Sequence, residues 1–524
     1  MGLSFKDVID INLWRPNSPA PAATGAGQSL ISDLRNDITK DPYLFLLRSA
    51  TVLDCYDPTT DEWLSLISPA LAGTFGAGAQ GVYHPSQGPR GVLAAGSTTG
   101  KVILSTALPA AVGVNQLANR GDGVGFKIRI NGNAGGSSGK VEERIIVANT
   151  AGTTPTIWVD APFVSTFIAG DAYEIHSGRI FFLNAGTLAA GMWKYYDRAC
   201  NVMSGNLATA SLPATVAGDS DLVALSEEYV PNSRKIGEGY IVGTGSYDGA
   251  SKLCLTATAI AAGTITGQAT GGDAGVLVNQ YRNFCQIRIV EDTVNVTAVG
   301  QRRRIVSHTV GPSAVYTLAS NWTVTPSENC KFVIENFDDY IILMTTQAAV
   351  FNYDITGNVW STAIWAAAAA AGAAGITIAH CWGIDPDVNV NVGQGCIYRI
   401  RGGGVATIDV FDMTNGVTGT WSADIAYGHK GLTLFTTGTS GIYDPATLGG
   451  RLLHLDVNGT QRGARFDMKN RVLDAETYIR MTQGAAVVGR KMGLALAIDG
   501  TTKIGFVYKL LHTLPNLYSL AIPR

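Results

Sequence analysis

Charge is scarce in this sequence. Asp, Glu, Lys and Arg together make up 15% of the 524 residues, where an average globular protein has about 25%. The formal net charge is −3, so no basic excess points to nucleic acid as a direct partner. Long hydrophobic runs are also missing: the most apolar one, residues 365–379, is mainly Ala and too short to cross a bilayer. Residues 1–19 lack the features of a secretion signal, so we expect neither a membrane segment nor export.

Cysteine occurs without any CxxC spacing, which excludes the common zinc-finger and thiol-redox frameworks. The cysteines are odd in number and widely separated, so we expect buried, reduced thiols in a chain made in a cytoplasm. A disulfide between Cys285 and Cys330, across an inserted segment, is the open alternative. The seven residues are Cys55, Cys200, Cys254, Cys285, Cys330, Cys381 and Cys396.

Glycine and β-branched residues are abundant instead. Gly accounts for 62 of 524 residues, or about 12%, whereas its usual share is about 7%. Gly supplies positive φ in tight turns, and Val and Thr pack well on pleated sheets, so the composition predicts an all-β chain with many short strands. The positive mean hydropathy of +0.15, with so little charge, favours a surface buried against neighbouring subunits. A secreted all-β domain shares this composition and is the alternative.

One short signature recurs along the chain: an aromatic residue, an Asp, a polar turn and then a Trp. The clearest copies are residues 56–63 and 353–360, with the Trp six positions after the Asp in both. A looser copy is residues 411–421, and a degenerate one is residues 196–203, with Met203 at the Trp position. The residues assigned to this repeat are Tyr56, Asp57, Trp63, Tyr196, Asp197, Tyr353, Asp354, Trp360, Phe411, Asp412 and Trp421.

The signature predicts a β-hairpin. The aromatic residue ends an apolar strand, Asp with Gly or Asn makes the turn, and the Trp opens the next strand. Sheets of this kind cannot bury both faces alone, so several of them must stack around an axis. The signature resembles the repeat of Kelch-type β-propellers, although the double Gly that normally begins a Kelch repeat is missing or displaced. The resemblance implies an all-β, Kelch-like β-propeller.

A different repeat lies between these hairpins. Residues 125–175 and 283–334 share landmarks 159 positions apart, such as an Ile-Arg-Ile step. Arg144 in the first copy matches Arg304 in the second only after a gap of one residue. Each copy alternates short apolar strands with Gly and Pro turns, which predicts two homologous small β-sandwich or barrel inserts that interrupt the propeller.

The inserted copies carry a second family resemblance. In the first copy, a strand beginning at Arg144 leads through a Trp/Pro segment to Gly-Asp-Ala-Tyr-Glu-Ile at residues 170–175. The second copy keeps this order but replaces Gly-Asp with Asn329-Cys330. The order is similar to a module of structural proteins in tailed bacteriophages. The resemblance implies a virion location, after synthesis in the cytoplasm of the bacterial host.

The N-terminal segment differs from the rest, with three prolines, a Gly/Ala stretch and little periodicity. Ile11, Leu13 and Trp14 are apolar anchors, so we expect an irregular arm that lies along a neighbouring subunit; a disordered tail is the alternative. The expected organisation is an N-terminal arm at 1–42, propeller blades at 43–95, 179–244 and 337–524, and β inserts at 96–178 and 245–336.

No group of residues has the spacing of a catalytic or metal site. Adjacent carboxylates, as at Glu142-Glu143, point to opposite faces of a strand and cannot act together on one bond. The seven histidines never recur at the short spacing that metal ligation from one element requires. We therefore expect no enzyme activity and no cofactor. The basic run at residues 301–304 is interpreted as an exposed strand that faces an acidic neighbour.

These observations favour a structural subunit of a tailed-phage virion, in the tail or nozzle, the neck or collar, or the capsid exterior. Its expected partners are copies of itself and other virion proteins. A propeller module that binds the host surface or a glycan, as in a phage receptor-binding protein, is the alternative, and a propeller enzyme is the third hypothesis. A glycan binder should cluster exposed Trp and Tyr, whereas Trp63, Trp360 and Trp421 recur at hairpin positions.

Overall fold

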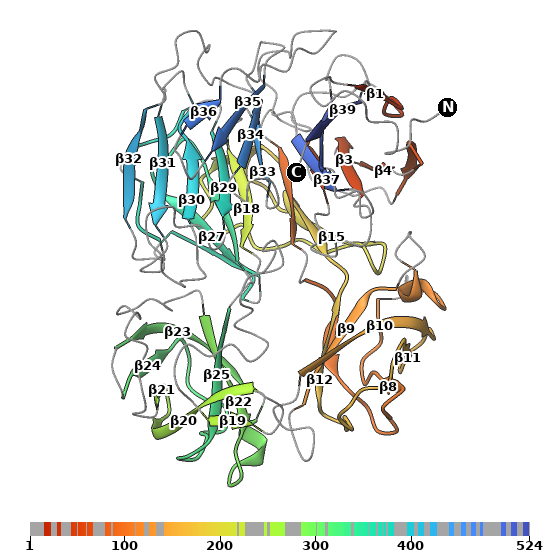
Figure 1. Ribbon diagram of the computed structural model, residues 1–524, viewed down its shortest axis with the longest axis vertical. Coiled ribbons are helices and arrows are strands. Elements are labelled where there is room, and N and C mark those ends of the chain that lie inside the picture. The colour runs from red at the N-terminus through yellow and green to blue at the C-terminus, as the bar shows by residue number, and fades with distance from the viewer. Residues whose placement is uncertain are drawn as a thin grey trace.

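The chain is nearly all β, as predicted (Figure 1). The only helical elements among the described residues are two single 3-10 turns, η2 (Gln116–Ala118) and η6 (Val296–Ala298), so no helix there could cross a membrane. The computed structural model describes residues 15–22, 29–32, 43–49, 51–58, 60–66, 79–84, 87–109, 112–119, 125–132, 141–216, 220–225, 246–248, 252–267, 285–299, 301–309, 313–336, 340–355, 357–362, 365–368, 370–373, 376–381, 396–402, 407–412, 420–426, 440–444, 452–456, 463–467, 472–474, 494–498, 505–510 and 517–522.

Six four-stranded antiparallel sheets are found within these residues. In chain order, the first three sheets are β2 (Ser29–Ser32), β3 (Leu44–Ser49), β4 (Val52–Asp57) and β5 (Glu62–Ser65); β6 (Gln80–His84), β13 (Arg179–Leu183), β15 (Trp193–Asp197) and β16 (Val202–Met203); and β18 (Asp221–Leu225), β26 (Tyr340–Met344), β27 (Val350–Asp354) and β28 (Val359–Ser361). A short ribbon, β14 (Gly186–Thr187) with β17 (Thr215–Val216), accompanies the second sheet.

The other three sheets come mainly from the C-terminal part of the chain. They are β29 (Thr377–Cys381), β30 (Cys396–Ile400), β31 (Thr407–Asp412) and β32 (Trp421–Ala426); β33 (Ser440–Asp444), β34 (Leu452–Asp456), β35 (Gly463–Asp467) and β36 (Val472–Asp474); and β37 (Leu494–Ile498), β38 (Gly505–Leu510) and β39 (Leu517–Ile522) with β1 (Arg15–Asn17). The last sheet therefore combines the two ends of the chain.

The six sheets form a closed ring. The first strands β2, β6, β18, β29, β33 and β37 contact one another in that order, and β37 contacts β2 again. Strands inside such a ring are covered on both faces, and their sequences are correspondingly apolar. In β13, Ile180 and Phe182 pack toward the first sheet, while Phe181 and Leu183 pack toward the third. The core thus lies between neighbouring sheets.

The N-terminal segment corrects one prediction. Residues 1–42 do not form an irregular arm throughout, because two described stretches of this segment are strands of the ring. Ser29–Ser32 pairs with Leu44–Leu47 as the innermost strand of the first sheet, and Leu30 and Ile31 are buried there. Arg15–Asn17 completes the last sheet by pairing with β39. The anchors Ile11, Leu13 and Trp14 lie outside the described residues.

Two further sheets stand apart from the ring as separate lobes in the lower half of Figure 1. Module 1 lies between β6 and β13 and has the strand order β7 (Arg90–Val92), β12 (Ala172–His176), β9 (Lys127–Asn131), β10 (Val141–Asn149), β11 (Thr156–Val159), β8 (Lys101–Ile103). Module 2 lies between β18 and β26 and has the order β20 (Lys252–Ala261), β25 (Lys331–Asn336), β22 (Cys285–Glu291), β23 (Arg302–His308), β24 (Val315–Leu318), β21 (Thr264–Gly267), with β19 (Ser246–Asp248) beside β20.

The two modules have the same strand order, and each sheet curls toward closure. In module 2, β20 pairs with both β21 and β25. In module 1, a single bridge between Leu93 and Leu104 connects the two edges. Module 1 begins at Arg90, before the expected boundary at residue 96, because Arg90–Val92 pairs with β12. The chain re-enters the ring at Gly178, whose φ of 72° and close approach to the Tyr83 ring leave no room for a side chain.

The register of the two modules is the same at an offset of 159 residues. Ile146 lies opposite Val159 in module 1, and Ile305 lies opposite Leu318 in module 2. A β-bulge follows directly in both, after Ile146 and after Ile305. No gap is needed within this stretch, so Arg144 corresponds to Arg303 and not to Arg304. The expected one-residue gap was wrong. Arg303 and Arg304 are adjacent, so Arg144 can be aligned with either of them when only residue types are compared.

Candidate interaction surface

The hairpin residues identified in the sequence lie together as cross-strand pairs. Tyr56 lies opposite Trp63, and Tyr353 lies opposite Trp360. The ring centroids are 5.1 Å apart in both pairs, with interplanar angles of 45° and 41°. The two hairpins therefore hold their indoles in the same way.

The other two copies follow the same pairing. Phe411 lies opposite Trp421, with ring centroids 5.2 Å apart, and Tyr196 lies opposite Met203. The side chain of Asp412, at the end of β31, is outside the described part of the structure.

The repeated Asp residues form local hydrogen bonds at the turns. Asp354 accepts a hydrogen bond from the amide of Gly357 at 2.8 Å. Asp197 accepts bonds from Arg179 Nε at 2.9 Å and from Ser177 Oγ at 3.0 Å. Asp57 ends β4 at the corresponding place. The Asp354 and Asp197 carboxylates thus fix the backbone and neighbouring side chains of their hairpins.

A further residue of the hairpin was missed in the sequence. Five positions after each tyrosine, an Asp or Asn with positive φ accepts a hydrogen bond from the tyrosine hydroxyl. The bonds run from Tyr56 to Asp61 (2.6 Å), from Tyr196 to Asn201 (2.9 Å) and from Tyr353 to Asn358 (2.8 Å). Asp and Asn tolerate the left-handed region better than other residues with a side chain, which explains their use here. The spacing was visible in the sequence and would have strengthened the repeat.

The repeated indoles are not presented to a ligand. Trp360 is buried between the second and third sheets, with its ring centroid 5.2 Å from that of Trp193. Trp63 donates its Nε1 hydrogen to the carbonyl oxygen of Ser18 at 3.0 Å, and Trp421 donates to Ala366 at 3.0 Å. These residues hold the ring together.

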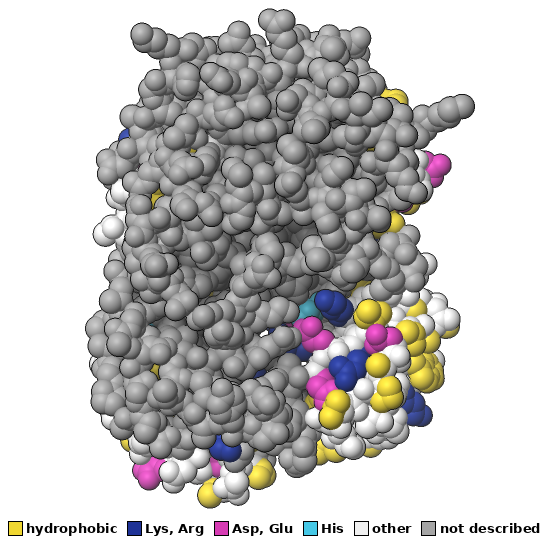
Figure 2. Space-filling model, in the orientation of Figure 1, with side chains coloured by type: hydrophobic (Ala, Val, Ile, Leu, Met, Phe, Trp, Pro, Cys, Tyr) yellow, Lys and Arg dark blue, Asp and Glu magenta, His cyan; other side chains and the backbone are white. Residues whose placement is uncertain are grey.

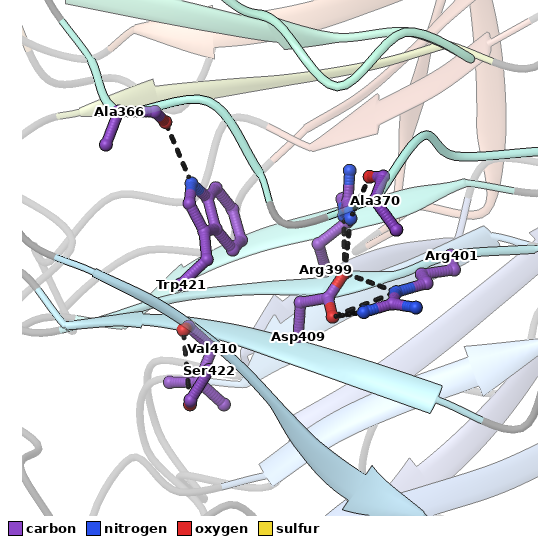
Figure 3. Close-up of polar contacts among 8 residues, drawn as sticks. All are labelled: Ala366, Ala370, Arg399, Arg401, Asp409, Val410, Trp421 and Ser422. Atoms are coloured by element: carbon purple, nitrogen blue, oxygen red, sulfur yellow. Dashed lines mark hydrogen bonds and ion pairs between the residues drawn. The ribbon is translucent and has the colours of Figure 1, made fainter.

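A buried ion-pair cluster lies in the fourth sheet (Figure 3). Asp409 accepts hydrogen bonds from Arg399 and from Arg401, the latter at 2.7 Å from Nη2. Arg399 is fully buried; it also donates to the Ala370 carbonyl at 2.9 Å and lies over the ring of Trp421. Burial lowers the pKa of Arg399, although the carboxylate of Asp409 opposes this effect. The cluster contains no nucleophile, and it ties β30 and β31 to the covering loop.

The buried thiols also lack the features of a reactive site. Cys55, Cys200 and Cys330 are free and buried, so Cys330 is not bonded to Cys285. Burial, with the nearby charge of Asp292, raises the pKa of the Cys330 thiol to about 12, which keeps it protonated at neutral pH. Among the described residues, no three His, Cys, Asp or Glu side chains form a group that could hold a metal ion.

Module 1 carries a candidate interaction surface, and the loop after β11 forms part of it. Phe163 and Phe167 of this loop are buried and meet edge to face, with centroids 5.2 Å apart. The Glu142 carboxylate accepts hydrogen bonds from the amides of Val164 and Ser165 at 2.8 and 2.7 Å. The loop is therefore held rigidly by both apolar and polar contacts.

Glu142 is itself stabilised as a carboxylate. Partial burial alone would raise its pKa, but hydrogen bonds from Ser165 and Val164, with the charge of Arg144, outweigh burial and lower the pKa below its ordinary value. Arg144 also donates to the carbonyl oxygen of Pro162 and lies over the ring of Phe163. The charged pair acts as a clamp on the loop.

Module 2 builds the same clamp with partly different residues. Arg303 donates to the Asn321 carbonyl at 2.8 Å and lies over the ring of Trp322, at positions 159 beyond their counterparts. Gln301 replaces Glu142 and accepts hydrogen bonds from the amides of Thr323 and Val324 at 2.8 and 3.2 Å. Both loops therefore have the same backbone support.

The exposed side chains of module 1 have partly different counterparts in module 2. In module 1, Val147 and Trp158 on the barrel wall, and Val164 and Ile168 on the clamped loop, are exposed, with Val164 at 90%. We call these four residues the outer face of module 1. Hydrophobic side chains gather along the outer edge of this lobe, at the lower right of Figure 2. The module 2 counterparts of these residues are Val306, Thr317, Thr323 and Ser327. Three of the four apolar side chains are thus replaced by hydroxyl-bearing ones.

Module 2 exposes apolar side chains at another place. Val294 is 73% exposed, and Val296, which begins η6, is also exposed. Asp292 fixes this loop between β22 and β23 by accepting hydrogen bonds from the amides of Val294 and Asn295 at 3.0 and 2.8 Å. We call Val294 and Val296 the module 2 tip.

Comparison with known proteins adds little to this description. No protein-family model and no curated protein matches the sequence. Among solved structures, Sqt1 of Saccharomyces cerevisiae is 8% identical over 97% of this chain and 100% of its own, with a TM-score of 0.28.

Two further structures are similarly remote. A point mutant of the NanB sialidase of Streptococcus pneumoniae is 9% identical over 97% of this chain and 94% of its own, with a TM-score of 0.24. A protein of unknown function from Bacteroides thetaiotaomicron is 11% identical over 52% of this chain and 73% of its own, with a TM-score of 0.21. Similarities this low support no conclusion about fold family or activity.

Proposed function

We propose that this chain is a structural subunit of a tailed bacteriophage virion and assembles in multiple copies. In this proposal the ring of sheets is a six-bladed, Kelch-like β-propeller, and modules 1 and 2 are two copies of one inserted β module. The sequence resemblance of the inserts to phage structural modules supports the virion role. The tyrosine hairpins, repeated in three sheets, support the propeller.

The observation that carries the assembly role is the outer face of module 1. A loop clamped by Arg144 and Glu142 presents Val164 almost fully to solvent, although the same loop in module 2 presents Thr323. Apolar side chains that gather on one exposed surface, as along the edge of this lobe in Figure 2, are characteristic of surfaces that are covered by another protein. An assembly subunit gives this surface a purpose, whereas an isolated chain would gain nothing from it.

The alternative of a glycan-binding module rests on a single residue. Trp158 is the one exposed aromatic side chain among the described residues, and sugars commonly stack on such rings. A glycan site should combine several exposed aromatic and polar side chains. No second exposed aromatic side chain accompanies Trp158 in the described part of the chain, which favours a protein contact.

Quantitative mass spectrometry of purified particles of the phage that encodes the chain tests the proposal. We expect the chain at a fixed number of copies per particle, a small multiple of the portal symmetry. Negative-stain imaging of particles labelled with an antibody against module 1 should then place it at one site. Absence from particles, or a variable trace amount, would contradict the virion role, and specific binding to a glycan array would favour the alternative.

A further inference from the structure

The fourth sheet buries an arginine whose counterpart in the first sheet is apolar. Arg399 lies directly opposite Asp409 in the pairing of β30 with β31. At the matching place in the first sheet, Leu46 lies opposite Asp54, and both carboxylates precede the aromatic residue of their hairpin by two positions. Leu46 and Arg399 are both fully buried. Arg399 therefore adds a positive charge where the first sheet has a hydrocarbon side chain.

The carboxylate of Asp409 is paired even without this extra arginine. Arg401 donates to both of its oxygens, from Nε at 2.9 Å to each and from Nη2 at 2.7 Å to Oδ1. In the first sheet, Arg48 donates to Asp54 in the same way, from Nε at 2.6 Å. Asp409 and Arg401 are the charged groups that act on Arg399. The cluster thus holds two positive charges and one negative charge, so one positive charge is left unbalanced.

One nitrogen of Arg399 also lacks an acceptor. Nε and Nη2 donate to Asp409, and Nη2 donates to the Ala370 carbonyl as well. Trp421 covers one face of the guanidinium, with its ring centroid 5.3 Å from Cζ. Nη1 is buried, and the described part of the chain offers it no acceptor. In Figure 3 the guanidinium extends from Asp409 toward the covering loop. Because a buried charged donor without an acceptor is costly, this nitrogen should bind a ligand that supplies a lone pair and a negative charge.

From these observations we propose that the fourth sheet binds one chloride ion beside Nη1 of Arg399. A single negative charge balances the cluster, and the attraction between the two ions is strong in the low dielectric of the interior. A doubly charged anion such as phosphate would reverse the imbalance, and its burial would cost more hydration energy. The guanidinium keeps its charge at every pH at which proteins are folded, so binding does not depend on a titration. This inference does not depend on the proposed function.

The bound ion should hold the covering loop closed. This loop, described at residues 365–368 and 370–373, is fixed to the cluster by the Ala370 carbonyl and by the amide of Ala373, which donates to the carbonyl oxygen of Arg401 at 2.8 Å. Because Nη1 is buried beside the loop, the ion enters and leaves when the loop opens. A ligand that binds only the closed state shifts the equilibrium toward that state by mass action.

Hydrogen exchange at the Ala373 amide of the full-length chain tests this coupling. Chloride replaces gluconate, a much larger anion, at constant ionic strength. Above the dissociation constant, the opening constant of the loop should fall about tenfold for each tenfold rise in chloride, as for one site. Arg399→Leu copies the first sheet and should abolish this dependence, while Asp409 stays paired with Arg401. Arg90→Leu removes a partly exposed arginine of module 1 and should respond to chloride like the wild type.

A second measurement locates the ion in the wild type and needs no variant. Crystals of the full-length chain grown in sodium bromide should show an anomalous scattering peak within hydrogen-bond distance of Arg399 Nη1. No peak there would mean that water satisfies this nitrogen, which overturns the proposal. A peak without any response of wild-type exchange to chloride would indicate an adventitious ion only and would also overturn it. An equal response in the wild type and in Arg399→Leu would place the chloride elsewhere. None of these outcomes bears on the virion role.

Discussion

Modules 1 and 2 hold equivalent loops in place with different side chains. In module 1 the amide of Ile168 donates to Asp171, whereas in module 2 the amide of Ser327 donates to Asp292. Position 330, the counterpart of Asp171, is a cysteine, and a carboxylate from another loop takes over its task. The positive φ before it is kept, at 90° for Gly170 and 69° for Asn329.

This comparison separates the framework from the surface. The loop amides at three matched positions receive a side-chain acceptor in both modules, because an amide without a partner is costly. The loop side chains differ: module 1 exposes Val164 and Ile168, whereas module 2 exposes Thr323 and uses the Ser327 hydroxyl to donate to Asp292. The duplicated fold is therefore a constant support for two different surfaces.

Truncation of the shared core should have the largest effect and should affect the modules equally. Ile146 and Ile305 are both fully buried directly before the shared bulge. Ile146→Ala and Ile305→Ala should each destabilise their module by about 2–5 kcal/mol, from lost burial and the cavity left behind. Denaturant unfolding, followed by hydrogen exchange in each module, measures the change. A large loss in one module with almost none in the other would break the equivalence.

The exchange of carboxylates between the two loops can be tested by rescue. Asp292→Ala should cost about 1–3 kcal/mol, because the amide and hydroxyl of Ser327 lose their acceptor. Adding Cys330→Asp should recover part of this loss by restoring the arrangement of Asp171. Amide exchange of the loop at residues 319–330 reports both steps. Asp292→Ala with no gain in exchange, or a double variant as mobile as the single one, would show that Asp292 does not replace Asp171.

Acid should weaken the module 1 loop through Glu142. Since its pKa in the folded chain lies below the ordinary value of 4.5, its contribution is complete above that value and is lost as the pH falls through the lowered pKa. Glu142→Gln should cost less than about 1 kcal/mol at neutral pH, because Gln301 does the same in module 2. Hydrogen exchange at Val164 and Ser165 should become less sensitive to acid in this variant. Unchanged acid sensitivity would place the titrating group elsewhere.

The smallest expected effect concerns the surface exchange itself. Val164→Thr with Ile168→Ser should change the free energy of unfolding of the dissociated chain by no more than about 0.5 kcal/mol, since both side chains are exposed to solvent. Thermal unfolding at a concentration below assembly measures this. A large loss would mean that these residues support the module itself.

The sequence predicted those parts of the fold that repeat locally. Tyr56 with Trp63 and Tyr353 with Trp360 revealed the hairpin, because a turn and its cross-strand pair lie within eight residues. Pairings between distant segments have no such signal. Arg15–Asn17 completes a sheet begun near the C-terminus, and the three-residue strand alone does not specify this partner. The sequence did not predict the outer face of module 1 for the same reason. The exposure of a side chain depends on the whole barrel, and in the sequence Val164 does not differ from the buried apolar residues around it.

Thiol labelling of Val164→Cys tests the central claim most directly, because Val164 is 90% exposed and belongs to the outer face of module 1. The described native thiols Cys55, Cys200 and Cys330 are buried. The account predicts that a water-soluble maleimide modifies Val164→Cys rapidly in the dissociated chain and much more slowly in purified particles, where another protein covers this face. Equal rates of modification in particles and in the dissociated chain would contradict it.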